Sequence, residues 1–220
     1  MQPQTHPTIP TSFMYLYRRI FATDFYPLLA ISLLFLWIVQ SLNGYYLPRL
    51  ETRIGYQPYD PISEALPCIN LSIFIFVVLY GSMFVGVVGL LKHKEHLLKM
   101  LVAFSTMYLI RLCTITLLPL EPPAGLVELQ DPILESLFNK VFLKKDLFFS
   151  GHFSTMFIFF LVAPTSKYKW YFLAASVAMA FLVWIQHIHY TFDVAGGVCF
   201  SILSVKITEK ILEKIGGIIE

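Results

Sequence analysis

Long apolar segments, separated by short polar or proline-containing breaks, constrain the fold of this chain more than any other feature. A helix needs about 20 mostly apolar residues to cross a bilayer. Backbone groups inside a bilayer must be hydrogen-bonded within the protein, so such segments are expected to be helical. The expected fold is therefore an all-α bundle of six transmembrane helices. The candidate segments are Phe25–Leu47, Pro67–Leu91, Leu97–Leu118, Ser150–Pro164, Trp170–Ile188 and Thr191–Leu212.

The composition also indicates a membrane protein. Hydrophobic residues make up 57% and charged residues 14% of the 220 residues, unlike an ordinary soluble domain. We expect a cytoplasmic or interfacial segment (1–24), a six-helix membrane domain (25–212) and a short cytoplasmic tail (213–220). The three cysteines have no paired spacing, so neither a disulfide framework nor a metal site is expected.

The distribution of basic residues predicts the orientation, because Lys and Arg are enriched on the cytoplasmic side of membranes. With six helices, ten of the 16 Lys and Arg residues fall on the side that holds both termini, and six fall on the other. Both termini are thus expected in the cytoplasm. The same topology places Arg111, His152, His189 and Asp193 toward the exoplasmic face.

Two histidine motifs stand where apolar segments begin, Ser150-Gly151-His152 and His189-Tyr-Thr-Phe-Asp193. Ionisable groups at membrane depth are costly and usually functional. His189 and Asp193 are four residues apart, so on a helix they would share a face. The carboxylate could then fix the imidazole tautomer and leave the other ring nitrogen free as a base or nucleophile.

Three further residues suit phosphate. Ser150 is a favourable N-cap, and the free N–H groups of the helical turn that begins at Gly151 attract anions. Arg111 adds planar donors that match phosphoryl oxygens. The pattern indicates phosphoryl chemistry in which His152, His189 and Asp193 are catalytic, while Arg111, Ser150 and Gly151 bind phosphate. No metal or other cofactor is expected.

Each of these residues also has a purely structural interpretation. The His189/Asp193 pair could be a satisfied hydrogen bond or part of a proton path, and Arg111 could tether two helices. His187 points to a different face from His189 and is expected to be a bystander. Lys144 and Lys145 are expected to be interfacial anchors or to steer an anionic headgroup.

The segments Phe149-Ser-Gly-His152 and His189-Tyr-Thr-Phe-Asp-Val194 resemble the two signature motifs of the sphingomyelin synthase family, a branch of the type 2 phosphatidic acid phosphatase superfamily. Tyr108–Pro119, which contains Arg111, is similar to that family's preceding motif, and Asp60–Pro67 is a weaker match. The resemblance covers about residues 60 to 200, with the catalytic motifs in 108–194. It implies a six-helix fold with an exoplasmic site.

The resemblance also implies the roles of the three catalytic candidates. His189 would be the nucleophile that forms a phosphohistidine, Asp193 would orient it, and His152 would act as general acid and then as base. Departures from the phosphatase branch favour the synthase branch: no Arg-Pro dipeptide occurs, Val183 replaces an arginine and Phe149 replaces a proline. Phe153 stands where the synthases usually have threonine.

These observations lead to the hypothesis of a lipid phosphotransferase. It would move a phospho-headgroup from a glycerophospholipid donor to ceramide or a similar lipid alcohol, both taken from the bilayer, with no nucleic-acid partner. One alternative is a phosphatase or phospholipase C-type hydrolase that uses the same site with water as the acceptor. Another is a non-catalytic lipid-binding or transport protein with the same fold.

Overall fold

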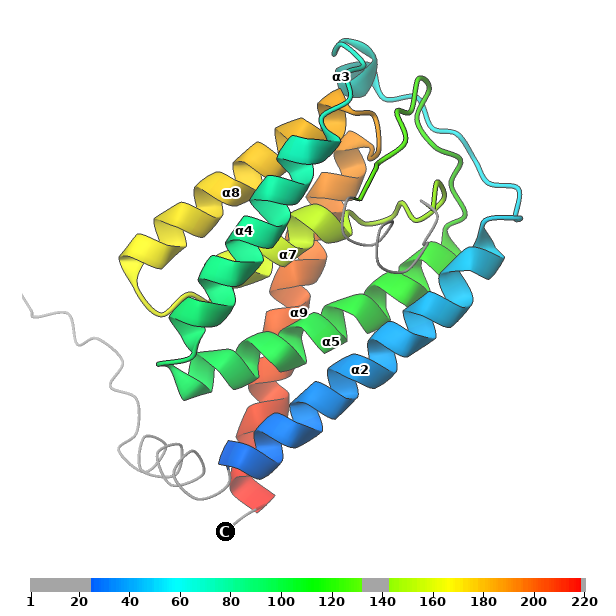
Figure 1. Ribbon diagram of the computed structural model, residues 1–220. Helices are drawn as coiled ribbons and strands as arrows, with labels where there is room; N and C mark the ends of the chain where they lie inside the picture. Colours follow the sequence, from blue (N-terminus) through cyan, green and yellow to red (C-terminus); the bar gives the residue numbers. More distant parts are fainter. Residues whose placement is uncertain (1–24, 132–142, 219–220) are drawn as a thin grey trace, which may run out of the picture.

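The computed structural model describes residues 25–131 and 143–218, and the expected segment 1–24 lies outside them. In the described residues the chain is all-helical, as predicted, apart from one isolated bridge between Tyr56 and Leu120. The elements, shown in Figure 1, are α2 (Phe25–Leu50), α3 (Pro61–Glu64), α4 (Ser72–Leu90), α5 (Lys94–Leu117), α7 (Gly151–Val162), α8 (Ser166–Ile185) and α9 (Thr191–Ile218).

Five of these helices, α2, α4, α5, α8 and α9, are long and apolar enough to cross a membrane. This agrees with a multi-pass membrane protein. The remaining expected span, Ser150–Pro164, corresponds to α7, which has only 12 residues. At about 1.5 Å per residue it is about 18 Å long, whereas the hydrocarbon core is about 30 Å thick. The helix is short because it starts after the Ser150 N-cap and its C-cap is Ala163, just before Pro164.

Other boundaries also differ from those expected. The segment predicted as Trp170–Ile188 is α8 at Ser166–Ile185, which includes the basic residues Lys167 and Lys169. The predicted tail 213–220 is helical up to Ile218, as part of α9. Charged residues with good helix propensity, such as Lys210 and Glu213, continue this helix beyond its apolar part. The second helix begins at Ser72 instead of Pro67. The preceding segment is non-helical, and the backbone N–H of Ile69 donates a hydrogen bond to the carbonyl of Ile185.

The short helix α7 lies in the centre of the bundle. It contacts α4, α5, α8 and α9, and these neighbours surround it in Figure 1. An apolar helix that is covered on most sides belongs to the core. In contrast, α2 packs on α5 at the periphery. The buried residues of α7 are Phe153, Ser154, Thr155, Met156, Ile158, Phe159 and Val162.

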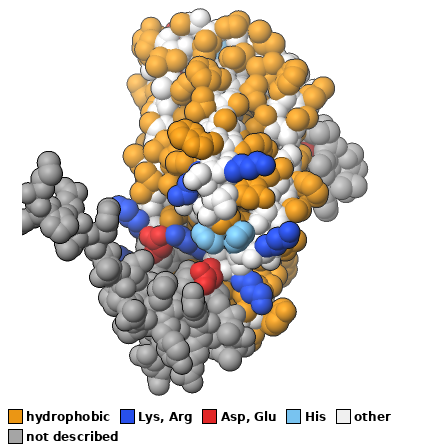
Figure 2. Space-filling view, turned by 90° about the vertical axis from the view of Figure 1, so that its left-hand side faces the viewer, with side chains coloured by type: hydrophobic (Ala, Val, Ile, Leu, Met, Phe, Trp, Pro, Cys, Tyr) orange, Lys and Arg blue, Asp and Glu red, His pale blue; other side chains and the backbone are white. Residues whose placement is uncertain are grey.

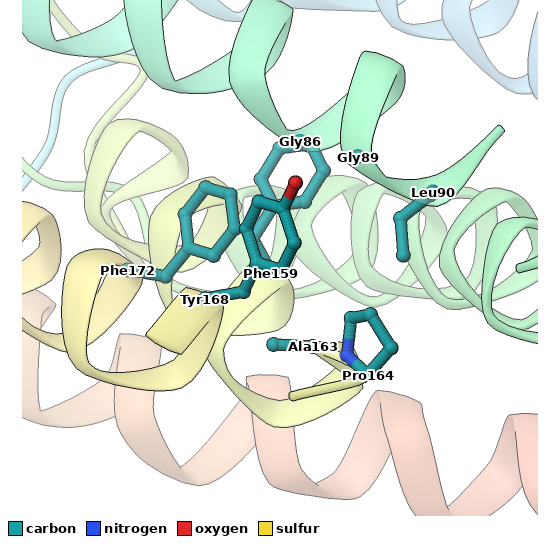
Figure 3. Close-up of a pocket in the computed structure, with 8 residues that line it drawn as sticks. All are labelled: Gly86, Gly89, Leu90, Phe159, Ala163, Pro164, Tyr168 and Phe172. Carbon is teal, nitrogen blue, oxygen red and sulfur yellow. The ribbon is translucent and has the colours of Figure 1, made fainter. Parts of the chain in front are cut away.

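Aromatic rings fill the contact between α4, α7 and α8. Figure 3 shows Phe159 and Phe172 beside the glycine-containing face of α4. The two rings are stacked, with centroids 4.9 Å apart. A Cβ atom at Gly86 would lie 2.3 Å from the Phe159 ring. A glycine at this position therefore allows α4 to pack closely on α7.

The outer surface has the pattern expected at a membrane boundary. Large apolar side chains face outward, among them Trp37, Phe84 and Trp170, whose exposed fractions are 66%, 71% and 71%. Figure 2 shows a broad hydrophobic surface that borders a band of Lys, Arg and His side chains. Charged and aromatic residues commonly mark membrane interfaces. Of the exposed lysines at one end of the bundle, Lys92 follows α4, Lys94 begins α5, and Lys167 and Lys169 lie in the first turn of α8.

Candidate active site

The connections at the opposite end of the bundle are joined to one another by polar contacts. Arg53 donates hydrogen bonds to the carbonyls of Thr116 and Ile115, both at 2.8 Å, at the end of α5. Lys145 donates to Glu121 at 2.7 Å, and this hydrogen bond lowers the pKa of the Glu121 carboxyl. We call the end of the bundle that holds these connections the site end. Here α2, α5 and α8 finish and α4, α7 and α9 begin.

His189 and Asp193 meet at the start of α9. His189 Nδ1 lies 3.2 Å from Asp193 Oδ2, and the two side chains are 4% and 0% exposed. The same carboxylate oxygen accepts a hydrogen bond of 2.9 Å from the backbone N–H of Tyr190. Because a carboxylate accepts, Nδ1 carries the proton and Nε2 has the free lone pair. The predicted contact is therefore present.

The reason for this contact differs from the one given by the sequence pattern. The helix α9 begins at Thr191, so His189 precedes it and the two residues do not share a helical face. Asp193 instead reaches back from the first turn to the N–H of Tyr190, as the acidic residue of a capping box does. The helix start thus holds the carboxylate, and the carboxylate holds the imidazole.

A residue from a distant segment anchors the same helix start. Asp60 accepts hydrogen bonds from the backbone N–H of Thr191 at 2.5 Å and from its hydroxyl at 3.0 Å. Its carboxylate also caps α3 through the N–H groups of Ile62 and Ser63. Burial alone would raise the pKa of Asp60, but these hydrogen bonds outweigh burial and lower it. Asp60 therefore links α3 to the beginning of α9.

The second histidine motif opens α7. The Ser150 hydroxyl is the N-cap and accepts from the N–H of Phe153, while the N–H of Ser150 donates to the carbonyl of Asp193 at 3.1 Å. This backbone bond joins the two motifs directly. His152, in the first turn of α7, faces His189 with a ring-centroid distance of 6.2 Å. The expected meeting of the two histidines is thus present.

Arg111 on α5 holds the segment that precedes α7. Its Nε donates to the carbonyl of Phe149 at 2.7 Å, and its terminal nitrogens donate to the carboxylate of Asp146 at 2.7 Å and to the carbonyl of Asp146 at 2.9 Å. A Cβ atom at Gly151 would lie 3.2 Å from Nε, so glycine allows the guanidinium to lie against the helix start. Arg111 therefore tethers α5 to this segment, whatever else it binds.

A cavity of about 810 Å³ lies in front of these groups. Its wall includes His152, His189, Arg111 and Asp146, and the rest of the wall comes largely from α2, α4 and α5. The cavity can accept a ligand of lipid headgroup size. Ser150 and Gly151 are absent from the described wall, and their predicted contact with phosphate remains a prediction.

Other residues named from the sequence have structural partners. His187 is buried, and its Nδ1 and Nε2 lie 2.8 Å and 3.3 Å from the carbonyls of Ala124 and Leu66. It stabilises the loops and, among the described residues, is not part of the cavity wall. Lys144 and Lys145 form ion pairs with Glu128 and Glu121, so each already has an acidic partner.

The sequence assigned no role to two acidic residues that the fold brings to the site. Asp146 pairs with Arg111, and Asp60 anchors the start of α9. Of the two, only Asp60 had a signal in the sequence, the weak match over Asp60–Pro67. In the described residues no group of three or more His, Cys, Asp or Glu side chains is arranged to hold a metal ion. Comparisons with protein-family models, curated proteins and solved structures find no match for this chain.

Proposed function

We propose that this chain is an integral-membrane enzyme of the six-helix type 2 phosphatidic acid phosphatase kind, and specifically a sphingomyelin synthase-like phosphotransferase. The observation that carries this proposal is the meeting of His152 with the His189/Asp193 pair at one cavity. In this arrangement α7 is the sixth membrane helix. It is short, but four other helices enclose it.

The first step would transfer the phospho-headgroup to the enzyme. A glycerophospholipid places its phosphodiester in the cavity, and Nε2 of His189 attacks phosphorus. Asp193 stabilises the imidazolium charge that develops, because it already accepts the Nδ1 proton. The bond from phosphorus to the diacylglycerol oxygen breaks as protonated His152 gives that oxygen its proton. Diacylglycerol leaves, and the headgroup phosphate remains on His189.

The second step would reverse these roles. A lipid alcohol enters the same cavity, and neutral His152 removes its hydroxyl proton. The resulting oxygen attacks phosphorus and the phosphorus–nitrogen bond to His189 breaks. His152 is protonated again and ready for the next donor. Arg111 has three donor groups engaged with Asp146 and Phe149, and its two other N–H groups could contact phosphoryl oxygens.

The proposed orientation follows from the charge distribution. The exposed lysines Lys92, Lys94, Lys167 and Lys169 lie at the end of the bundle away from His152 and His189. Under the positive-inside rule this end faces the cytoplasm. Both termini would then be cytoplasmic, and the site end would be exoplasmic.

The test uses the purified full chain with phosphatidylcholine or phosphatidylethanolamine labelled in the headgroup, with and without ceramide. Transfer predicts a labelled sphingolipid that forms only when ceramide is present. The His152→Ala and His189→Ala variants should lose at least about 10²- to 10⁴-fold in rate, the usual contribution of acid–base groups. His93→Ala, at the other end of the bundle, is the matched control and should retain the wild-type rate.

Two outcomes would reject the transferase. Free phospho-headgroup or phosphate without any labelled sphingolipid would identify the hydrolase alternative, with water as the acceptor at the same site. Unchanged function in both histidine variants would identify the non-catalytic lipid-binding or transport protein.

A further inference from the structure

On α2 the cavity wall includes two polar side chains, Gln40 and Asn43, that the proposed chemistry does not use. Gln40, Asn43 and Gly44 line it on the side of α2, whereas His152 and His189 line it on the side of α7 and α9. Asn43 is only 5% exposed, although it lies in an apolar membrane helix. Asparagine has a lower helix propensity than alanine or leucine, so its presence here needs a physical explanation.

The one side-chain hydrogen bond that Asn43 makes in the described residues defines which amide atom lacks a partner. Its Nδ2 donates to the carbonyl of Val39, one turn earlier, at 2.8 Å. This bond fixes the orientation of the amide, because only the nitrogen can donate. The other amide atom, Oδ1, is buried and has no hydrogen-bond partner among the described residues. A buried acceptor without a partner costs about 1–3 kcal/mol, and such groups are rare in folded proteins.

The position of Asn43 along α2 matches the depth of the proposed chemistry. It lies seven residues before the end of α2 at Leu50, which is about 10 Å at 1.5 Å per residue. Arg111 lies six residues before the end of α5 at Leu117, about 9 Å by the same rise. The two helices pack on each other and both finish at the site end. Asn43 is therefore near the level of the phosphate site.

The next residue, Gly44, lines the same cavity as Asn43. A Cβ atom built at Gly44 would meet no atom within 4 Å, so this glycine adds no bulk to the wall beside Asn43. Because Oδ1 can only accept, the ligand group that pairs with it must be an N–H or an O–H.

We infer that Asn43 is a subsite for the acceptor lipid, and that it binds an amide N–H next to the reactive hydroxyl. The inference rests on the proposed function. A diacyl glycerophospholipid has only ester and phosphate acceptors near its glycerol, so it offers Oδ1 no donor there. An acceptor with a hydroxyl and a neighbouring amide N–H can present the hydroxyl to His152 and the amide to Asn43. The subsite thereby distinguishes acceptor from donor lipid.

The first test uses the wild-type chain and three acceptors with equal acyl chains: a ceramide, its N-methylated analogue and diacylglycerol. The ceramide should be used about tenfold more efficiently, in kcat/KM, than the N-methylated analogue, since one hydrogen bond of about 1.4 kcal/mol corresponds to a factor of ten. Equal use of the ceramide and the N-methylated analogue would overturn the inference while leaving the transferase intact. Transfer to none of the three, with headgroup release to water, would reject the proposed function itself.

The second test is Asn43→Leu, which removes the Oδ1 hydrogen-bond acceptor but keeps a side chain of similar size. This variant should lose the tenfold preference and use the ceramide and its N-methylated analogue with equal kcat/KM. Gln40→Leu is the matched control on the same helix and should keep the preference. A preference retained in Asn43→Leu would contradict the assignment. If that variant failed to fold, the wild-type comparison of acceptors would still decide the question.

Discussion

Replacement of Arg111 by lysine separates two roles of this residue, the tethering of the segment before α7 and the binding of phosphate. Lysine keeps the positive charge and remains a phosphate binder, but it lacks the planar fork of arginine. In the wild type, three donors of Arg111 hold Phe149 and Asp146. A single ammonium group in place of the guanidinium would lose the geometry of at least two of these bonds.

The size of the effect follows from these contacts. A hydrogen bond from a charged donor contributes about 1.5–3 kcal/mol, so two lost bonds would cost about 3 kcal/mol even after the loop relaxes. The freed segment leads directly into the helix that carries His152. A displacement of about 1 Å at a catalytic group can cost about 10²-fold in rate. We therefore expect Arg111→Lys to lower kcat about 100-fold, with a smaller change in KM for the donor.

The assay combines initial transfer rates with thermal unfolding in the same detergent. Arg53→Lys is the matched control, because Arg53 also donates to two backbone carbonyls at the end of α5 but is not part of the described cavity wall. It should reduce stability and leave kcat near the wild-type value. A normal kcat in Arg111→Lys would refute the tethering role, and an equal rate loss in Arg53→Lys would show that the effect is not specific.

Three further variants test the supports of the site and of the bundle. Asp60→Asn should lower the free energy of unfolding at pH 7 by about 2 kcal/mol, because two charge-assisted bonds to Thr191 are weakened. Since folding lowers the pKa of Asp60, the difference in stability from wild type should shrink only as pH falls below the ordinary Asp range. A constant difference from pH 7 to pH 2 would contradict this. Asp193→Asn should reduce kcat on the order of 10³-fold with little change in melting temperature, because the imidazole tautomer is no longer fixed; a wild-type kcat would exclude the orienting role. Gly86→Ala should destabilise the protein by about 1–3 kcal/mol through overpacking. Gly81→Ala, where a Cβ meets no atom within 4 Å, should be neutral or stabilising. Equal melting temperatures for the two variants would contradict the packing in Figure 3.

The helical class and the contact of His189 with Asp193 could be predicted from the sequence, because both depend on local patterns. The approach of His152 to His189 was expected from the topology, which puts both at the same end of the bundle. Apolar length indicates helices, and the spacing of His189 and Asp193 limits their separation. The start of the last helix at Thr191 was also predicted. The anchoring of this start by Asp60, a residue 131 positions away, was not. The bounds expected for α7, Ser150–Pro164, are close to the observed Gly151–Val162, because the Ser150 N-cap and Pro164 mark both ends in the sequence.

The tethering role of Arg111 was also only one of two interpretations at the level of sequence. Its partners, Phe149 and Asp146, come from a different segment, and their approach depends on the packing of α5 against α7. The unpaired side-chain oxygen of Asn43 could not be predicted from the sequence either. An asparagine in an apolar helix is visible in the sequence, but the lack of a partner is visible only when the neighbouring helices are in place.

The central claim is that His189 carries the phospho-headgroup between two lipids. The most direct measurement is mass spectrometry of the purified wild-type chain, quenched in base after mixing with labelled donor lipid and no acceptor. The account predicts a phospho-headgroup adduct on His189 that disappears when ceramide is added, in step with the formation of labelled sphingolipid. Turnover of donor and acceptor with no adduct on His189, or with the adduct on another residue, would contradict it.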